Sequence, residues 1–441
     1  MKQVLVLGTG YVVKPLVDYF LEECKYQVFV ASRDNNRSGQ IIAGRPNGKR
    51  ILWSAKPPYD ELNRMVGEAD LVVSMIPPSM HPIVAKACIS NHVDMVTTSY
   101  ISPEMRALDE EAKGAGILIL NEIGEDPGMD HMGAQRVIHE IEADGGKVKS
   151  LTSYGAGIPS FEHNRNPMGY KFSWSPMGLM RAGENPAAYI KGGKRIEVSG
   201  EELFKHNWLV DIHNLGTFET YPNRDSTIYI DQYGLDADVD IYRGLLRFPG
   251  WCNTMQGFKD LGLFHSGDPQ ELSSMTYRQF TASLLDASDT QDIRQAAADH
   301  LGEARGSELL ARYEWLGLFD DEPVAISKGS PVDVLVDLML RKMAYAAHEK
   351  DMILIHNEII AEFDNRIERR VSTMRVEGRP YGHSAMSRAV SLPAAIASRL
   401  ILEGAICQKG VVMPTDPEIY KPVLSELLKH DYRFEHHTSV L

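Results

Sequence analysis

Near its N-terminus the chain carries the stretch Val4-Leu5-Val6-Leu7-Gly8-Thr9-Gly10-Tyr11-Val12-Val13. The apolar run at 4–7 predicts a buried parallel strand, the two glycines predict a sharp turn, and the pattern at 12–23 predicts a helix. Together they resemble the start of a dinucleotide-binding βαβ unit, in which Gly8 permits the turn and Gly10 lets a pyrophosphate approach the helix N-terminus. Because Val13 stands where the usual fingerprint has a third glycine, an ordinary strand-to-helix turn is the alternative interpretation.

The end of the second predicted strand indicates which dinucleotide would bind. This strand covers 27–31 and is followed by Ser32-Arg33-Asp34. An NAD enzyme usually places an acid here to bind the ribose 2′-hydroxyl, whereas an arginine suits the 2′-phosphate of NADP. Arg33 therefore favours NADP, while Asp34 keeps NAD possible. A solvated loop charge is the alternative interpretation of Arg33.

Strands and helices alternate through the first part of the chain. We predict helices at 60–68, 82–91 and 103–114, and strands at 70–76, 94–98 and 117–121. Residues 39–58 are rich in Gly, Pro and basic residues and predict a loop with one short strand at 51–53. The alternation as a whole predicts an α/β fold with a doubly wound parallel sheet, which is a Rossmann domain.

From Gly155 onward the pattern changes to alternating runs with many Gly, Pro and aromatic residues, which predicts a mixed or antiparallel sheet over 151–260. Residues 269–348 predict a helical insert, 352–360 and 369–376 paired strands, and 387–403 a long Ala-rich helix. We therefore expect three domains. They are a Rossmann domain at 1–125 completed by 405–441, an α+β mixed-sheet domain at 126–268 and 349–404, and a helical insert domain at 269–348.

Composition argues against several classes of function. The 441 residues carry a formal net charge of −14, which disfavours non-specific binding to nucleic acid or to an anionic membrane. Four scattered cysteines without CxxC spacing favour reduced thiols, and the N-terminal apolar run is too short for a secretion signal. No apolar stretch approaches membrane-spanning length, so we expect no membrane-spanning helix. We expect a cytoplasmic, soluble protein that has no nucleic-acid or membrane partner.

Polar side chains gather where predicted sheet strands end. Thr97-Thr98-Ser99-Tyr100 follows one strand, and ligands of open α/β sheets bind at such ends, although a merely polar strand end is equally possible. The next strand leads into Asn121-Glu122-Ile123-Gly124-Glu125-Asp126-Pro127-Gly128-Met129-Asp130-His131. A carboxylate here could act as an acid or base or bind a substrate ammonium, which we favour for Asp126, whereas we favour helix capping for Asp130. Asp126, Asp130 and His131 lack the spacing of known metal sites, so we expect no metal.

Two later segments combine aromatic and basic residues. The stretch 166–176 is rich in aromatic side chains, which either form core or wall a nicotinamide pocket. The segments 221–226 and 242–248 contribute the arginines Arg224, Arg243 and Arg247. Because arginine forks bind carboxylates bidentately, three of them in an acidic protein predict a small-molecule substrate with several carboxylates. Surface ion pairs are the alternative.

In their order and spacing these segments resemble the saccharopine dehydrogenase family of the glutamate-forming type, also called saccharopine reductases. The matching motifs cover nearly the whole chain and are GTGYVVKP, SMIPPSMHPIVAKACI, VTTSYISPEM, NEIGEDPGMDH, NPMGYKFSWSPMG, YPNRDST, YRGLLRFPGW, GHSAMSRAVSLPAAIASRLILEG and KGVVMP. The resemblance implies a Rossmann domain, a sheet-based domain for the substrate and for dimerisation, a small helical domain, and a homodimer.

The resemblance also implies the residues of the site, with Asp126 as the catalytic residue. The substrate contacts that it implies are Ser99, Tyr100, Asp126, Arg224, Leu245, Leu246 and Arg247. The cofactor contacts that it implies are Gly8, Gly10, Tyr11, Val12, Val13, Ser32, Arg33, Asp34, Ser74, Ile76, Pro77, Thr98, Gly124, Glu125, Asp126, Pro127 and Trp174.

The chain departs from the family pattern at three places. Members often carry an aspartate after the third strand, where this chain has Trp53-Ser54. They tend to show Cys-Gly-Gly where this chain has Gly155-Ala156-Gly157, and Gly-Thr-Leu-Arg where it has Gly244-Leu245-Leu246-Arg247. The first change affects the adenine side of the cofactor, and the other two affect the substrate side.

The reaction that the resemblance implies is hydride transfer with NADP(H) at the CH–NH bond of saccharopine. It interconverts saccharopine with L-glutamate and 2-aminoadipate 6-semialdehyde in lysine metabolism. Arg224 and Arg247 would hold carboxylates, and Asp126 would pair with the substrate nitrogen. The alternatives are a related reductive condensation of the carboxynorspermidine or homospermidine type, whose substrates carry fewer carboxylates, and a non-catalytic NAD(P)-binding protein.

Overall fold

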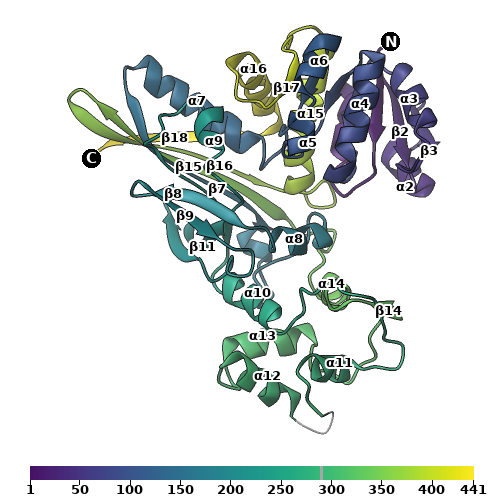
Figure 1. The fold of residues 1–441 in the computed structure, drawn as a ribbon, viewed down its shortest axis with the longest axis vertical. Coiled ribbons are helices and arrows are strands. Elements are labelled where there is room, and N and C mark those ends of the chain that lie inside the picture. The colour runs from purple at the N-terminus through teal and green to yellow at the C-terminus, as the bar shows by residue number, and fades with distance from the viewer. Residues whose placement is uncertain (289–291) are drawn as a thin grey trace. The chain divides into compact units, whose positions relative to one another are not determined.

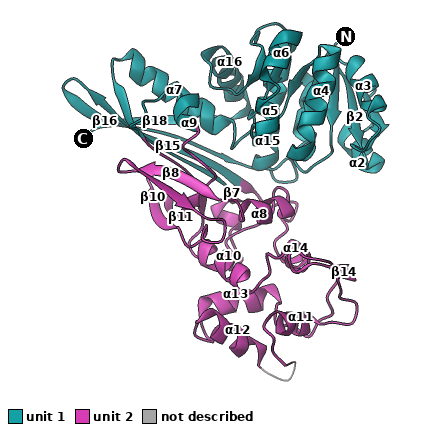
Figure 2. Cartoon of the chain, in the orientation of Figure 1, with its two compact units in different colours: residues 1–157, 229–239, 352–441 teal, residues 158–228, 240–351 magenta. Residues whose placement is uncertain are grey.

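The computed structural model (Figure 1) describes residues 1–288 and 292–441. The chain forms two units. The first unit comprises residues 1–157, 229–239 and 352–441 and is teal in Figure 2, and the second comprises 158–228 and 240–351 and is magenta. The three-domain division expected from the sequence, with a separate helical insert, stays a prediction.

The first unit contains a seven-stranded parallel sheet, in the order β17-β6-β5-β4-β1-β2-β3. The strands are β1 Gln3–Leu7, β2 Gln27–Ser32, β3 Gly48–Leu52, β4 Leu71–Ser74, β5 Asp94–Val96, β6 Leu118–Leu120 and β17 Gly410–Val412. The chain runs outward from β1 to β3, returns to β4 on the other side of β1, and runs outward again. This reversal is the doubly wound arrangement, with its switch point between β1 and β4, so the predicted α/β Rossmann fold is confirmed.

The connections between these strands are mostly helical and correct two expectations. They are α1 Lys14–Asp18, a π-helical turn at Tyr19–Glu23, α2 Asn35–Ile42, α3 Asp60–Gly67, a 3₁₀ turn at Pro78–Met80, α4 His81–Asn91, α5 Pro103–Arg106 and α6 Asp109–Ala115. The loop expected from residue 39 was wrong, because the helix α2 runs to Ile42 and buries little more than Ile41 and Ile42, which is too short an apolar face to show a period. The single helix expected at 103–114 is two helices.

A second sheet in the first unit carries β7 Lys147–Pro159, β15 Asp351–Phe363, β16 Arg366–Glu377 and β18 Glu435–Val440 as successive neighbours. The strands β15 and β16 form a long antiparallel hairpin, as the sequence predicted. The helices of this region are α7 Met129–Ala143, α9 Tyr229–Gln232, α15 Ala385–Leu402 and α16 Pro417–Leu427, with a 3₁₀ turn at Leu428–His430.

The helix α15 corrects the expectation that no apolar stretch approaches membrane-spanning length. It has 18 residues with a mean hydropathy of 1.2, which suffices by length and composition alone, but 83% of it is buried inside the protein. It packs against α1 and α16. Its Arg399 donates from Nε to the hydroxyl of Tyr19 over 2.9 Å, and the Ser391 hydroxyl donates to the carbonyl of Val12. These contacts are those of a core helix.

The second unit is built on antiparallel strands, which confirms the mixed sheet expected after the Rossmann domain. The strands are β8 Ala187–Lys191, β9 Lys194–Val198, β10 Trp208–Ile212, β11 Gly216–Pro222 and β12 Asp240–Arg247, and a small pair is β13 Gln270–Glu271 with β14 Lys328–Gly329. The helices are α8 Pro176–Ala182, α10 Trp251–Asp260, α11 Tyr277–Leu284, α12 Ile293–Leu301, α13 Glu308–Leu316 and α14 Pro331–Lys342, with a 3₁₀ turn at Phe161–His163.

The turn after β1 requires glycine at only one of its two glycine positions. Gly8 has a φ of +107°, and a Cβ built there would lie 2.6 Å from the carbonyl oxygen of Met75, which begins the turn after β4. At Gly10 a Cβ would meet no atom within 4 Å. The backbone of β1 therefore needs Gly8 for the fold itself, whereas Gly10 leaves open space beside the turn.

We expect Gly8→Ala to destabilise the first unit by at least about 2 kcal/mol, because it combines a disfavoured φ with a backbone clash. The measurement is the melting temperature of the purified variant. The matched control is Gly10→Ala, which should melt like the wild type yet bind the dinucleotide more weakly. Equal melting temperatures for the two variants would contradict this prediction.

Asp18, at the end of α1, joins three basic groups of the first unit. Its carboxylate lies 2.8 Å from Lys14 Nζ, 2.6 Å from an Arg45 guanidinium nitrogen and 2.8 Å from His383 Nε2. Burial would raise the pKa of Asp18, but the hydrogen bonds from His383, Lys14 and Arg45 outweigh it and lower the pKa from 3.8 to about 2. A carboxyl with a depressed folded-state pKa stabilises the fold above its unfolded pKa, and this contribution is lost as the pH falls toward the folded value.

We therefore expect Asp18→Asn to lower the free energy of unfolding at pH 7 by about 2 kcal/mol, with the gap to the wild type closing as the pH falls from about 4 toward 2. Urea unfolding across this pH range is the measurement. Glu61→Gln is the control, because Glu61 forms only an exposed pair with Arg64 and should leave stability nearly unchanged. A gap between Asp18→Asn and the wild type that does not depend on pH would contradict this account.

Candidate functional site

Two predicted site residues at the carboxyl edge of the parallel sheet are joined through a histidine. His81, the first residue of α4, lies 2.9 Å from Ser74 Oγ through Nδ1 and 2.9 Å from Ser99 Oγ through Nε2. His81 is 2% exposed, and this burial lowers its pKa from 6.5 to about 4, so the ring is neutral at physiological pH. Sequence reasoning missed His81, because its partners come from different strands.

Asp126 lies in a tight turn between two glycines, Gly124 and Gly128, whose positions have little room for a side chain. The Gly124 amide donates to the Pro127 carbonyl over 2.9 Å, and the bond between Asp126 and Pro127 is cis. Gly128 has a φ of +146°, and a Cβ there would lie 2.2 Å from Gly124 backbone atoms. The turn presents the half-buried Asp126 carboxylate, whose Oδ1 accepts a hydrogen bond of 2.8 Å from the hydroxyl of Tyr100. The structure thus brings together two of the predicted substrate residues.

Glu122 ties the turn that carries Asp126 to the segment that carries Ser99 and Tyr100. Its amide donates to the Ser99 carbonyl over 3.1 Å, and its Oε1 accepts from the Ile101 amide over 2.9 Å. Its Oε2 lies 2.9 Å from His131 Nε2 and accepts from the Tyr229 hydroxyl over 3.1 Å. Glu122 is 3% exposed and its φ is +54°. The backbone conformation and the buried side chain together make Glu122 a support for the site.

His131 and Asp130 also serve this support. His131 is fully buried, and its Nδ1 lies 2.5 Å from the hydroxyl of Tyr233. The expectation that Asp130 caps the helix was wrong, because Gly128 is the N-cap of α7 and Asp130 lies inside the first turn. From there its Oδ1 accepts from the amide of Gly128, the N-cap residue, over 2.6 Å and so holds the turn that leads into the helix. Within residues 1–288 and 292–441, no group of three His, Cys, Asp or Glu side chains is arranged to hold a metal ion.

The segment after β2 combines a helix cap with two arginines. The Asp34 carboxylate accepts from the Arg37 amide over 2.9 Å and so caps α2, while Arg33 is exposed. Arg37 donates from Nε to the Thr9 carbonyl, and its guanidinium lies 5.2 Å from the ring centre of Tyr11. Asp34 therefore has a structural use, and the segment presents positive charge beside the glycine turn. Arg37 was not among the predicted residues.

Other predicted cofactor contacts are placed by packing in the same unit. Ser32 Oγ lies 2.8 Å from Thr9 Oγ1 and accepts from the Asp34 amide over 3.0 Å. Thr98 donates to the sulfur of Met75, and a Cβ on Gly124 would lie 3.1 Å from Thr98 Cβ. The remaining predicted contacts of this unit lie in the turns themselves and are Val12, Val13, Ile76, Pro77 and Glu125. Trp53, which stands where family members often carry an aspartate, is 9% exposed and belongs to the hydrophobic core.

In the second unit, Arg247 lies inside a group of aromatic rings. Its guanidinium carbon is 5.4 Å, 5.9 Å and 5.8 Å from the ring centres of Tyr170, Tyr221 and Trp251. The residue is 3% exposed, and one terminal nitrogen donates to the Leu246 carbonyl over 2.8 Å. Burial raises the pKa of the Tyr221 hydroxyl to about 12, so the ring stays neutral beside the cation. The predicted Trp174 donates from Nε1 to the Tyr170 hydroxyl over 2.9 Å.

Arg224 and Arg247 are held apart by the register of β11 and β12. Pro222 pairs with Gly244, and Glu219 pairs with Arg247. Arg224 follows β11, is exposed and has a φ of +57°. Because Glu219 lies opposite Arg247 and Arg224 comes five residues later, the backbone positions of the two arginines are roughly 17 Å apart along the strands. Leu245 and Leu246 lie between them on β12. The register therefore separates the backbone positions of the two arginines along the strands.

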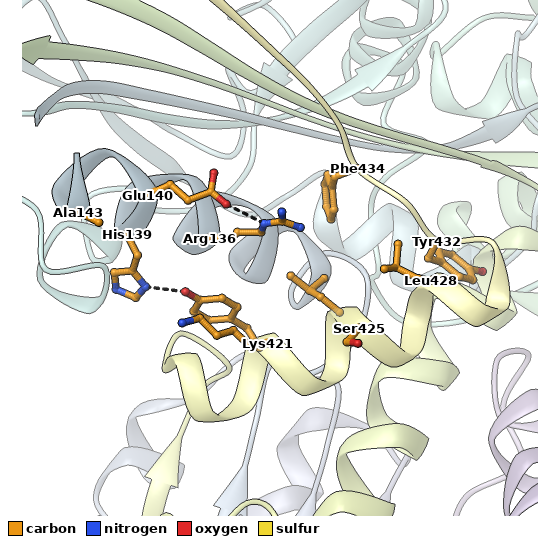
Figure 3. Close-up of a pocket in the computed structure, with 11 residues that line it drawn as sticks. Arg136, His139, Glu140, Ala143, Lys421, Ser425, Leu428, Tyr432 and Phe434 are labelled. Carbon is orange, nitrogen blue, oxygen red and sulfur yellow. Dashed lines mark hydrogen bonds and ion pairs between the residues drawn. The ribbon is translucent and has the colours of Figure 1, made fainter.

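A cavity of about 500 Å³ lies elsewhere in the first unit, between α7 and α16 (Figure 3). Arg136 pairs with Glu140 along its side, and His139 lies 2.8 Å from the Tyr420 hydroxyl. None of the predicted site residues lines it. The cavity is therefore distinct from the strand ends at which Ser99, Tyr100 and Asp126 meet.

Comparison with known proteins supports the family resemblance along the whole chain. Residues 124–432 match the saccharopine dehydrogenase C-terminal domain and residues 4–120 match the saccharopine dehydrogenase NADP binding domain. The chain is 33% identical to the saccharopine dehydrogenase [NADP(+), L-glutamate-forming] of Schizosaccharomyces pombe, over 99% of this chain and 98% of that protein. It is 35% identical to the mitochondrial alpha-aminoadipic semialdehyde synthase of Rattus norvegicus, over 97% of this chain but 46% of that longer protein.

The structure gives the same result. It matches the apo saccharopine dehydrogenase (L-Glu forming) of Saccharomyces cerevisiae with a TM-score of 0.88 and 33% sequence identity, over 100% of both chains. The expected resemblance is confirmed by sequence and by fold, and the chain belongs to the saccharopine dehydrogenase family.

Proposed function

We propose that this protein is an NADP-dependent oxidoreductase that acts on the CH–NH bond of saccharopine. It interconverts saccharopine with L-glutamate and 2-aminoadipate 6-semialdehyde in lysine metabolism. The observation that carries this proposal is the 33% sequence identity, over 99% of the chain, to a relative named for that reaction. The meeting of Tyr100 and Asp126 at the strand ends supports it, because ligands of such sheets bind there.

The residues after β1 and β2 fit an NADP molecule. The open space at Gly10 suits a pyrophosphate, and the positive charges of Arg33 and Arg37 suit a 2′-phosphate. Asp34 caps α2, so its carboxylate has a structural role that does not require a ribose hydroxyl, which fits NADP. When bound, NADP(H) accepts or supplies the hydride. The remaining work of the chain is to bind the substrate and orient its reacting carbon.

Asp126 is the residue that we propose to pair with the substrate nitrogen. Its negative charge would favour the positive charge that develops at that nitrogen, and the Tyr100 hydroxyl holds the carboxylate in place. We propose that Arg224 and Arg247 each bind a carboxylate. Arg224 is exposed, whereas Arg247 is held by three rings and keeps a fixed guanidinium plane.

We further propose that the enzyme is a cytoplasmic homodimer. Cys24, Cys88, Cys252 and Cys407 are free thiols, which suits a reducing compartment. The strand β18 lies at one edge of its sheet in the described part of the chain, and its residues are almost all exposed. An edge strand of this kind offers backbone groups to a second chain. The net charge of −14 supports the expected lack of nucleic-acid and membrane partners.

The first test is turnover. Purified protein mixed with saccharopine should reduce NADP, followed by absorbance, and should do so faster than it reduces NAD. Release of L-glutamate, measured separately, confirms which C–N bond is cleaved. Cofactor binding without turnover of saccharopine would contradict the proposal and favour a related condensation of the carboxynorspermidine or homospermidine type.

Gly155 offers a second test, because it departs from the family pattern beside the proposed catalytic residue. A Cβ built on Gly155 would lie 2.6 Å from Asp126 Oδ2 and 3.4 Å from Asp126 Cβ. We expect Gly155→Ala to displace the carboxylate and lower kcat/KM for saccharopine about tenfold, since a misplaced charge loses part of its stabilisation of the reaction.

The melting temperature of Gly155→Ala should stay close to that of the wild type, because the atom displaced is the end of a side chain. Gly114→Ala is the control, since a Cβ there meets no atom within 4 Å. Its kcat/KM should match the wild type. A Gly155→Ala enzyme with unchanged kcat/KM would show that Asp126 does not need its present position.

A further inference from the structure

His81 has no part in the proposed reaction, yet it is a buried polar group in contact with a proposed substrate residue. Its imidazole lies between Ser74 Oγ and Ser99 Oγ, at 2.9 Å from each. Ser74 is at the end of β4 and Ser99 follows β5, so the ring bridges two neighbouring strand ends. His81 is 2% exposed, and Ser74 is fully buried.

The directions of these hydrogen bonds follow from the burial of Ser74. The hydroxyl of Ser74 is fully buried, and its Oγ lies 2.9 Å from His81 Nδ1. The hydroxyl proton of Ser74 is therefore best satisfied by donation to Nδ1. A neutral imidazole carries one proton, so it then resides on Nε2. The hydroxyl of Thr97 is also fully buried, but its Oγ1 lies 3.2 Å from Nε2, farther than Ser74 Oγ lies from Nδ1, so the closer Ser74 contact sets the tautomer. Nε2 lies 2.9 Å from Ser99 Oγ and donates to it.

This direction sets how the Ser99 hydroxyl meets a ligand. Because Ser99 Oγ accepts from His81, its own proton turns away from the ring. In this chain the Ser74 hydroxyl donates to Nδ1 and Nε2 donates to Ser99 Oγ. Hydrogen bonds linked in this way polarise one another and become stronger. Ser99 is only half-buried, so its proton is available to an anionic acceptor.

We propose that His81 is a positioning residue that holds the hydroxyl of Ser99 as a hydrogen-bond donor to a carboxylate of the substrate. This inference rests on the proposed function, which makes Ser99 a substrate ligand. It assigns His81 a share in recognising the amino-acid end of the substrate, through Ser99, and no share in proton transfer.

The kinetic test compares His81→Leu, His81→Gln, Ser99→Ala and the double variant His81→Leu with Ser99→Ala. His81→Leu should raise KM for saccharopine about tenfold, with kcat changed less than twofold and KM for NADP unchanged. His81→Gln can place an amide N–H near the position of Nε2 and should recover most of the loss. In the Ser99→Ala background, the change at residue 81 should have little further effect on KM, because the two residues act as one unit.

The second measurement does not depend on turnover. The ¹⁵N NMR spectrum of histidine-labelled wild-type enzyme, with the His81 signals assigned by their loss in His81→Gln, should show Nδ1 unprotonated and Nε2 protonated at pH 7. A proton on Nδ1 would overturn the inference, whether or not the protein turns over saccharopine.

The outcomes separate the two proposals. Wild-type enzyme without saccharopine turnover overturns the proposed function, and it also overturns the substrate-binding part of this inference. Wild-type turnover combined with additive effects of His81→Leu and Ser99→Ala overturns the inference alone. If His81→Leu fails to fold, the His81→Gln kinetics and the tautomer of the wild type decide the question.

Discussion

The close approach of two backbones beside β1 is the constraint on which the rest of the first unit depends. The Leu7 carbonyl accepts from the Met75 amide over 2.8 Å, and Gly8 then passes so near the Met75 carbonyl that no side chain fits. This contact brings the ends of β1 and β4 together at the switch point of the sheet. The open space beside Gly10 and the segments after β4, β5 and β6 consequently meet on one edge, where Ser99, Tyr100 and Asp126 lie.

A buried polar network holds that edge in shape. Glu122 and His131 lie 2.9 Å apart inside the protein, and the hydroxyls of Tyr229 and Tyr233 complete their hydrogen bonds. Removing such groups from water is costly, and the cost is offset only when each polar atom finds a partner. Here the partners include the backbone around Ser99, Ile101 and Gly128, reached through Glu122 and Asp130. The network thereby links the segment that carries Tyr100 to the turn that carries Asp126.

Arg247 and Arg224, both in the second unit, lie in different surroundings. Arg247 is enclosed by aromatic rings, which attract the guanidinium through their faces and fix its plane. Arg224 follows the end of β11 in a left-handed conformation and is exposed. The strand register places their backbone positions roughly 17 Å apart along the strands.

The sequence by itself determined the Rossmann fold, the mixed sheet and the family, because strand periodicity, glycine turns and long motifs are local patterns. It also determined that Tyr100 and Asp126 belong to strand ends, since each follows a predicted strand. Sequence reasoning missed α2, whose apolar face is too short to show a period, and misassigned Asp130, whose partner is the backbone of the turn before α7. Only the tertiary structure decided that His81 joins Ser74 to Ser99 and that Glu122 binds His131. These contacts depend on which strands are neighbours, and that arrangement is set by packing across the sheet rather than by spacing along the chain.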